Sequence, residues 1–166
     1  ATRGGTNSTI GACMQIKIEQ GPFHSPLHGG EYAANGPSGP FPAWCAEQTQ
    51  SLSFGDVIDY LVVDGVAAWG SPISQALDRL MSWTVGAGWP TTIDQNDAIQ
   101  TDIWSILTGG AVNIDTSNAP ITQHAILLHS ATRQDLLFSQ PISEPNPLPM
   151  MLIGIALLAA YRSIRT

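Results

Sequence analysis

The sequence predicts an α+β domain that is mainly β, with antiparallel strands in a sandwich-like or barrel-like arrangement. Two helices inserted among the strands and one C-terminal transmembrane helix complete the prediction. Short apolar runs that alternate with polar residues predict the strands. Two longer segments that repeat apolar residues every three or four positions predict the helices. Strands that are interrupted by a few helices are typical of an α+β plan.

The composition limits the class of partner. The chain has 166 residues, enough for one domain with a substantial core, and carries 13 acidic against 6 basic residues, for a net charge of −7. Lys17 is the only lysine, so no basic patch is available for a nucleic acid. Only 11% of the residues are charged, which favours an extracytoplasmic domain over a cytosolic enzyme.

The N-terminal half is expected to hold strands joined by one long loop. Residues 1–9 are small and polar and predict a mobile leader, ahead of an extracytoplasmic domain over residues 10–140. Residues 21–42 collect ten glycines and prolines, which predicts a long irregular loop with at most a short edge strand at 31–34. Alternating apolar residues predict strands at 14–19, 43–47 and 57–63.

The first helix is expected to start at Ser71, as the capping residue, with Pro72 in the first helical position. Its apolar stripe comprises Ile73, Ala76, Leu77, Leu80 and Met81. Two further strands are predicted at 125–128 and 136–138.

The second helix, residues 98–107, is expected to be capped by Asp94 or Asp97 and ended by the glycines at 109–110. It carries a glutamine on its apolar face, where Gln100 shares a stripe with Ile103, Trp104 and Leu107. A buried amide without hydrogen-bond partners is unfavourable, so the site must offer Gln100 something in return. Either nearby backbone supplies the partners, or Gln100 has lost its amide nitrogen to a cysteine thiol.

The chain has two cysteines, Cys13 and Cys45. In an oxidising compartment they can form one disulfide, which would leave Gln100 with its amide. The sequence alone does not decide between this disulfide and a bond between Gln100 and a cysteine.

The C-terminal segment differs in kind from the rest. Residues 141–147 predict a linker with a Pro-Glu-Pro-like motif at 143–145, and residues 148–166 predict a membrane-anchoring helix with a basic tail. Counted from Pro147, the helix has about 18 residues if its arginines reach the interface, marginally enough to span a bilayer. Its expected members include Leu148, Met151, Ile153, Ile155, Leu158, Tyr161, Arg162 and Arg165. The terminal arginines predict a cytoplasmic C-terminus and a periplasmic or extracellular domain.

Two motifs, WCAE at 44–47 and IQTDIW at 99–104, together resemble the thioester domains of bacterial surface proteins. That family has an aromatic-Cys-apolar motif on a strand and an apolar-Gln-x-x-apolar-Trp motif on a later helix. The resemblance covers roughly residues 14–107. It implies that Cys45 and Gln100 condense with loss of ammonia into an internal thioester, and that Trp44 and Trp104 shield this bond from water.

The resemblance implies a function without turnover. A buried thioester is an electrophile that an amine or hydroxyl on a target can attack, which leaves the protein covalently attached. We therefore expect adhesion or cross-linking, no enzymatic activity and no cofactor. No metal site is expected either, because the histidines have no recognisable ligand spacing; they are His24, His28, His124 and His129.

The C-terminal segment resembles the PEP-CTERM sorting tail, with Ser143 in place of the first proline. This resemblance implies a single-pass protein of the bacterial inner membrane. The alternative function is an accessory structural subunit of a large membrane complex, for example a photosynthetic or respiratory one. The expected partners are membrane lipid, other membrane-protein subunits and, for a thioester, a covalent target.

Overall fold

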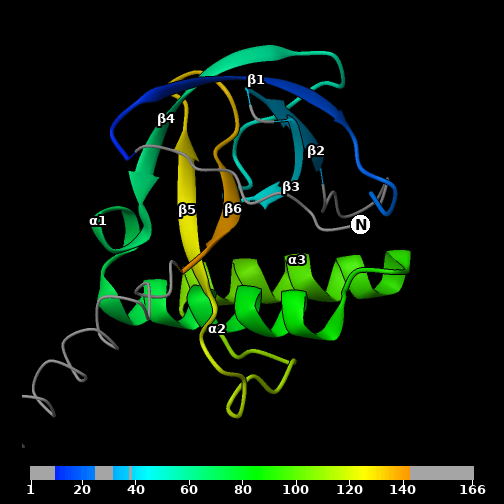
Figure 1. The fold of residues 1–166 in the computed structure, drawn as a ribbon, viewed down its shortest axis with the longest axis vertical. Coiled ribbons are helices and arrows are strands. Elements are labelled where there is room, and N and C mark those ends of the chain that lie inside the picture. The colour runs from blue at the N-terminus through cyan, green and yellow to red at the C-terminus, as the bar shows by residue number, and fades with distance from the viewer. Residues whose placement is uncertain (1–9, 25–31, 38, 143–166) are drawn as a thin grey trace, which may run out of the picture.

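Six antiparallel strands close into a barrel in the computed structural model, which describes residues 10–24, 32–37 and 39–142 (Figure 1). The strands follow one another around the barrel in the order β1-β2-β3-β6-β5-β4. They are β1 (Cys13–Gln20), β2 (Tyr32–Gly36), β3 (Gly39–Cys45), β4 (Val57–Asp64), β5 (Gln123–His129) and β6 (Leu136–Pro141). Three helices lie between β4 and β5 in the described chain: α1 (Gly65–Trp69), α2 (Ser71–Ala87) and α3 (Ile93–Thr108). The predicted mainly β, antiparallel fold is confirmed, and its form is a closed barrel.

Alternating side chains fill the barrel interior. On β1, Met14, Ile16 and Ile18 are buried while the residues between them face solvent, as expected for a half-buried strand. The complete interior cluster contains Met14, Ile16, Ile18, Tyr32, Ala34, Phe41, Ala43, Cys45, Ile58, Tyr60, Val62, Ile126, Leu128, Leu136 and Phe138. The strands predicted at 14–19 and 57–63 are confirmed.

A second apolar cluster lies between the barrel and two helices. α2 and α3 run side by side under the barrel (Figure 1), and α2 packs on β5. This helix-layer cluster contains Trp44, Leu77, Leu80, Met81, Ile99, Ile103, Ile106, Ala125 and Leu137. β3 therefore serves both clusters, because Cys45 belongs to the interior while its neighbour Trp44 faces the helices.

The prediction for residues 21–42 is partly wrong. The short strand expected at 31–34 is present as β2, although β2 has neighbours on both sides and is not an edge strand, and β3 begins at Gly39, inside the predicted loop. β2 and β3 form a hairpin there, in which Pro40 pairs with Asn35 and Pro42 with Ala33. Proline removes a backbone donor, so a strand that holds it needs one side free of ladder bonds. β3 meets this condition, because its pairing with β6 involves only its last two residues. The composition therefore predicted a loop where an alternating strand exists.

The helix starts also differ from the prediction. Gly70 is the N-cap of α2, so Ser71 is the first helical residue rather than the cap. α3 is capped by Thr92, whose hydroxyl accepts a hydrogen bond from the Gln95 N–H at 3.2 Å. The caps predicted at Asp94 or Asp97 are wrong, although Asp94 lies in the first turn, where the helix dipole favours a carboxylate.

The short helix α1 was not predicted from the sequence. Asp64 ends β4 and caps α1 by accepting from the N–H groups of Val66 and Ala67. Five residues are too few to show a helical repeat, so no periodicity could indicate this element.

No helix within residues 10–24, 32–37 and 39–142 is long and apolar enough to cross a membrane. The predicted membrane helix at 148–166, the motif at 143–145 and the leader at 1–9 lie outside the described residues.

Candidate functional site

Cys45 and Gln100 are 55 positions apart in the sequence and in direct contact in the fold. The backbone N–H of Cys45 donates to Gln100 Oε1 at 2.9 Å, and Gln100 Nε2 donates to the Cys45 carbonyl at 2.9 Å. The Gln100 side chain is fully buried, and Cys45 is 3% exposed. The structure thus brings together the two residues that the thioester resemblance paired.

The sequence left two explanations for a buried Gln100: partners in nearby backbone, or a bond to a cysteine. The structure gives Gln100 backbone partners, and both of them belong to Cys45. The two bonds also fix the orientation of the carboxamide, because the oxygen meets a donor and the nitrogen meets an acceptor. The side chain therefore presents its carbonyl group to this cysteine in one defined way.

This arrangement suits chemistry at the Gln100 carbonyl carbon. Oε1 is the atom on which negative charge would build if a nucleophile attacked that carbon, and the Cys45 N–H already donates to it. A backbone donor that is aimed at a developing oxyanion is the usual means of stabilising acyl transfer. Nε2, the atom that would depart as ammonia, is held on the other side by the Cys45 carbonyl.

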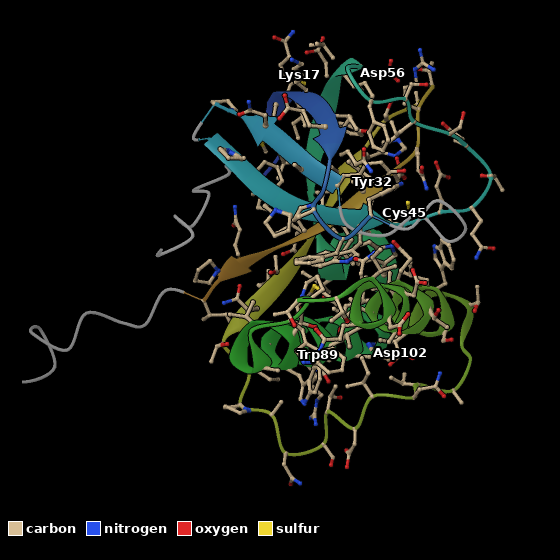
Figure 2. All side chains as sticks on the ribbon, turned by 90° about the vertical axis from the view of Figure 1, so that its right-hand side faces the viewer. Lys17, Tyr32, Cys45, Asp56, Trp89 and Asp102 are labelled. Carbon is tan, nitrogen blue, oxygen red and sulfur yellow. The ribbon has the colours of Figure 1, made fainter. Side chains whose placement is uncertain are left out.

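The sulfur of Cys45 lies in the barrel interior and meets a tyrosine. The thiol donates to the hydroxyl oxygen of Tyr32 at an Sγ–Oη distance of 3.9 Å, and both residues belong to the interior cluster (Figure 2). Burial, and next the neighbouring Cys45, raise the pKa of Tyr32 well above its usual range. The Tyr32 hydroxyl therefore stays protonated and can act as a hydrogen-bond donor.

An aromatic cover, made of His24 and Phe54, lies against Tyr32. The ring centroids are 4.8 Å apart for His24 and Tyr32, 6.1 Å for Tyr32 and Phe54, and 5.2 Å for His24 and Phe54. Phe54 is 50% exposed, so the cover faces solvent on one side and the tyrosine on the other. The sequence placed Tyr32 in a short strand at 31–34 but assigned no role at the site to Tyr32 or to the cover, because the contacts between them form only in the fold.

The two tryptophans that were expected to shield the site lie on different sides of it. Trp104, one helical turn after Gln100, packs against the interior cluster that contains Cys45. Its indole N–H is buried and has no hydrogen-bond partner in the structure. Trp44 lies on the opposite face of β3, where its indole N–H donates to Asn96 Oδ1 at 3.3 Å. Trp104 is therefore the tryptophan on the side of the sulfur.

Cys13 and Cys45, both within the described chain, do not form a disulfide in the structure. Cys13 is exposed on β1, opposite Leu61 of β4, whereas Cys45 is buried at the end of β3.

A polar hollow of about 490 Å³ begins three residues beyond Cys45. It lies between the segment that follows β3 and the loop between β5 and β6. Its polar lining residues are Gln48, Thr49, Gln50, Ser51, Thr132 and Arg133. A polar partner that reached this hollow would lie close along the chain to the candidate site.

A separate polar cluster joins three elements away from Cys45. His124 on β5 contacts Asp64 through Nε2 at 2.8 Å and Asp78 of α2 through Nδ1 at 3.2 Å. Burial lowers the pKa of His124, but the hydrogen bonds to the two carboxylates outweigh it and raise that pKa overall. Across the described residues, no three His, Cys, Asp or Glu side chains are placed to hold a metal ion.

No protein-family model matches the chain, and comparisons with curated proteins and with solved structures found no match.

Proposed function

We propose that this chain is a covalent-attachment domain, in which Cys45 and Gln100 form an internal thioester that reacts once with a target. One observation carries the proposal: the buried Gln100 carboxamide is hydrogen-bonded through both of its polar atoms to Cys45. A glutamine that only fills space in the core can take its hydrogen-bond donor and acceptor from any neighbour. A thioester precursor must instead be held beside its cysteine, as these two bonds do for Gln100. The residues at 44–47 and 99–104, which resemble the thioester-domain motifs, supply the same pair.

The chemistry needs no external oxidant or cofactor. In the first step the Cys45 sulfur bonds to the Gln100 Cδ, the Cδ–Nε2 bond breaks, and ammonia leaves with the thiol proton. In the second step an amine or hydroxyl of the target bonds to Cδ and the C–S bond breaks. The sulfur regains a proton, which the nucleophile loses, and the target stays attached to residue 100.

The surroundings of the site support storage of a reactive bond. A thioester at this position is kept from water by burial in the interior cluster and by Trp104. The polar hollow, whose lining begins three residues after Cys45, offers a place for a polar target close along the chain to the bond. We propose adhesion or cross-linking at a bacterial membrane surface as the role, with residues 148–166 as the anchor.

The test is an intact mass of the native, non-reduced protein, measured before and after treatment with methylamine. We expect a native mass that is lower than the sequence mass by one ammonia, and the gain of one methylamine after treatment. Cys13→Ser should behave in the same way, because Cys13 takes no part in the bond. Cys45→Ala should show the full sequence mass and no adduct.

Two outcomes contradict the proposal. A native mass that is lower by only two hydrogens would show a Cys13–Cys45 disulfide in place of the thioester. Methylamine labelling at Gln100 that persists in Cys45→Ala would show a reaction that does not pass through the cysteine.

A further inference from the structure

The proposed thioester must release a sulfur into the barrel interior when it is attacked. A thiolate is poorly solvated among apolar side chains, so the release is slow unless a donor meets the sulfur. We infer that the Tyr32 hydroxyl is this donor and that it stabilises the Cys45 thiolate as the C–S bond breaks. The inference rests on the proposed function, because it assigns a role in the same reaction.

The position of Tyr32 supports this role. Tyr32 lies on β2 opposite Ala43 of β3, two residues before Cys45, and its Oη lies 3.9 Å from Cys45 Sγ. Tyr32 is only 7% exposed, so little water can compete for the sulfur on this side. The contacts of its ring with His24 and Phe54 limit how far the hydroxyl can move away.

The direction of the hydrogen bond follows the state of the sulfur. As a thiol, Cys45 donates a hydrogen bond to Tyr32 Oη. A thiolate has no proton to donate, so the tyrosine hydroxyl turns its own proton toward the sulfur. Burial keeps Tyr32 protonated, so it donates a hydrogen bond and is not itself ionised. The proton that finally neutralises the sulfur comes from the attacking amine.

The barrel contains a matched control for this tyrosine. Tyr60 is fully buried in the same interior cluster, and burial raises its pKa as well. Its hydroxyl, however, donates to the backbone carbonyl of Gln134 at 3.0 Å, and its connection with Cys45 is electrostatic only. Removal of either hydroxyl disturbs the core, but only one removal takes away the donor to Cys45.

The experiment compares Tyr32→Phe and Tyr60→Phe in the full chain with the Cys13→Ser substitution. The measured quantity is the rate of methylamine addition, followed by intact mass. We expect Tyr32→Phe to react about tenfold more slowly, because one hydrogen bond to a charged group is lost. Tyr60→Phe should stay within about twofold of the parent.

A second readout separates this role from a purely structural one. In the methylamine-opened protein, Cys45 carries a thiol that is no longer acylated, and its ionisation can be followed by thiolate absorbance against pH. Loss of the donor in Tyr32→Phe should raise the pKa of Cys45 by about one unit, and Tyr60→Phe should leave it near the parent value. If Tyr32→Phe does not fold, 3-fluorotyrosine at position 32 is the alternative, and its stronger donor should speed methylamine addition.

The outcomes distinguish the two proposals. A wild-type protein that loses ammonia, together with equal rates and equal Cys45 titrations in the two tyrosine variants, overturns the role of Tyr32 and leaves the thioester standing. A wild-type protein that never loses ammonia overturns the proposed function and this inference with it.

Discussion

At the scale of single residues, Gln100 and Cys45 satisfy one another. The carboxamide donates one hydrogen bond to the backbone of Cys45 and accepts one from it, at 2.9 Å each, and both residues are buried. Buried polar groups contribute little when paired and cost much when one partner is removed. The stability of the site and its proposed chemistry therefore depend on the same two contacts.

This dependence predicts the effect of Gln100→Ala in a Cys45→Ala background, where no thioester can form. We expect the free energy of unfolding to fall by about 2–4 kcal/mol, because a cavity opens and the backbone N–H and C=O of residue 45 lose their partners. Urea denaturation measures the change. Gln15→Ala is the control, since Gln15 is exposed and makes only a long contact, 3.4 Å, with Asp59; a loss of equal size in both variants would contradict the prediction.

At the scale of elements, His124 joins β5 to the end of β4 and to α2. The cluster is completed by Asp64, which caps α1, and by Asp78, whose second oxygen accepts from the Ala125 N–H at 2.7 Å. The pKa of Asp64 is lowered, chiefly by its hydrogen bond with His124. The connection between helices and barrel is therefore strongest when His124 is protonated and Asp64 is ionised.

The pH dependence of stability follows from these shifts. The pKa of His124 is raised in the folded state above its ordinary value of 6.5, so its contribution is complete below that pH and is lost as pH rises through the folded pKa. The contribution of Asp64 to stability has the opposite pH dependence. It is complete above the ordinary carboxyl pKa of 3.8 and is lost as pH falls through the lowered pKa of the folded state.

We expect the urea midpoint of the wild type to decrease as pH is raised from below 6.5 into the alkaline range, and His124→Gln to show a smaller decrease. His129→Gln is the matched control. His129, the last residue of β5, contacts Asp135 in the loop between β5 and β6, and this contact does not join α2 to the barrel. Equal pH profiles for the wild type and His124→Gln would contradict this role.

Also at this scale, the sequence predicts an element well where one physical signal dominates. β1 and β4 alternate cleanly, since one face of each lines the interior. β2 was expected only as a short edge strand, and the first part of β3 was predicted as loop because glycine and proline dominate its composition. Proline is tolerated there because this part of β3 lacks a second neighbour.

The candidate site shows the same division. Cys45 and Gln100 could be paired from their motifs, whereas the role suggested for Tyr32 depends on the register of β2 against β3. That register is a property of the folded hairpin, and no local pattern indicates it.

At the scale of the whole molecule, the Cys45–Gln100 contact joins the barrel to the helix layer. The strands close into a barrel, and α3 reaches both apolar clusters through Ile103 on one side and Trp104 on the other. A covalent bond at this contact would cross-link the two layers over a long loop of chain.

This cross-link predicts a difference in stability between the native and the methylamine-opened protein. By loop-closure entropy, a link that closes a loop of this length contributes about 4 kcal/mol. We expect the opened protein to unfold at a clearly lower urea concentration, by circular dichroism, with Cys45→Ala behaving like the opened form. Identical midpoints would contradict a cross-link in the native state.

The same contact has a mechanical consequence for a protein that is covalently attached to a target while force acts on the attachment. A target that bonds to Gln100 pulls against the anchor proposed at residues 148–166, so the load runs through the chain that follows residue 100. The segment between residues 45 and 100 does not lie on this path, and its release from the bond adds no slack to the attachment. β5 and β6 do lie on the path, and hydrogen-bonded pairing with neighbouring strands holds both of them in the barrel. The attachment would therefore resist force for as long as these two strands keep their places in the barrel.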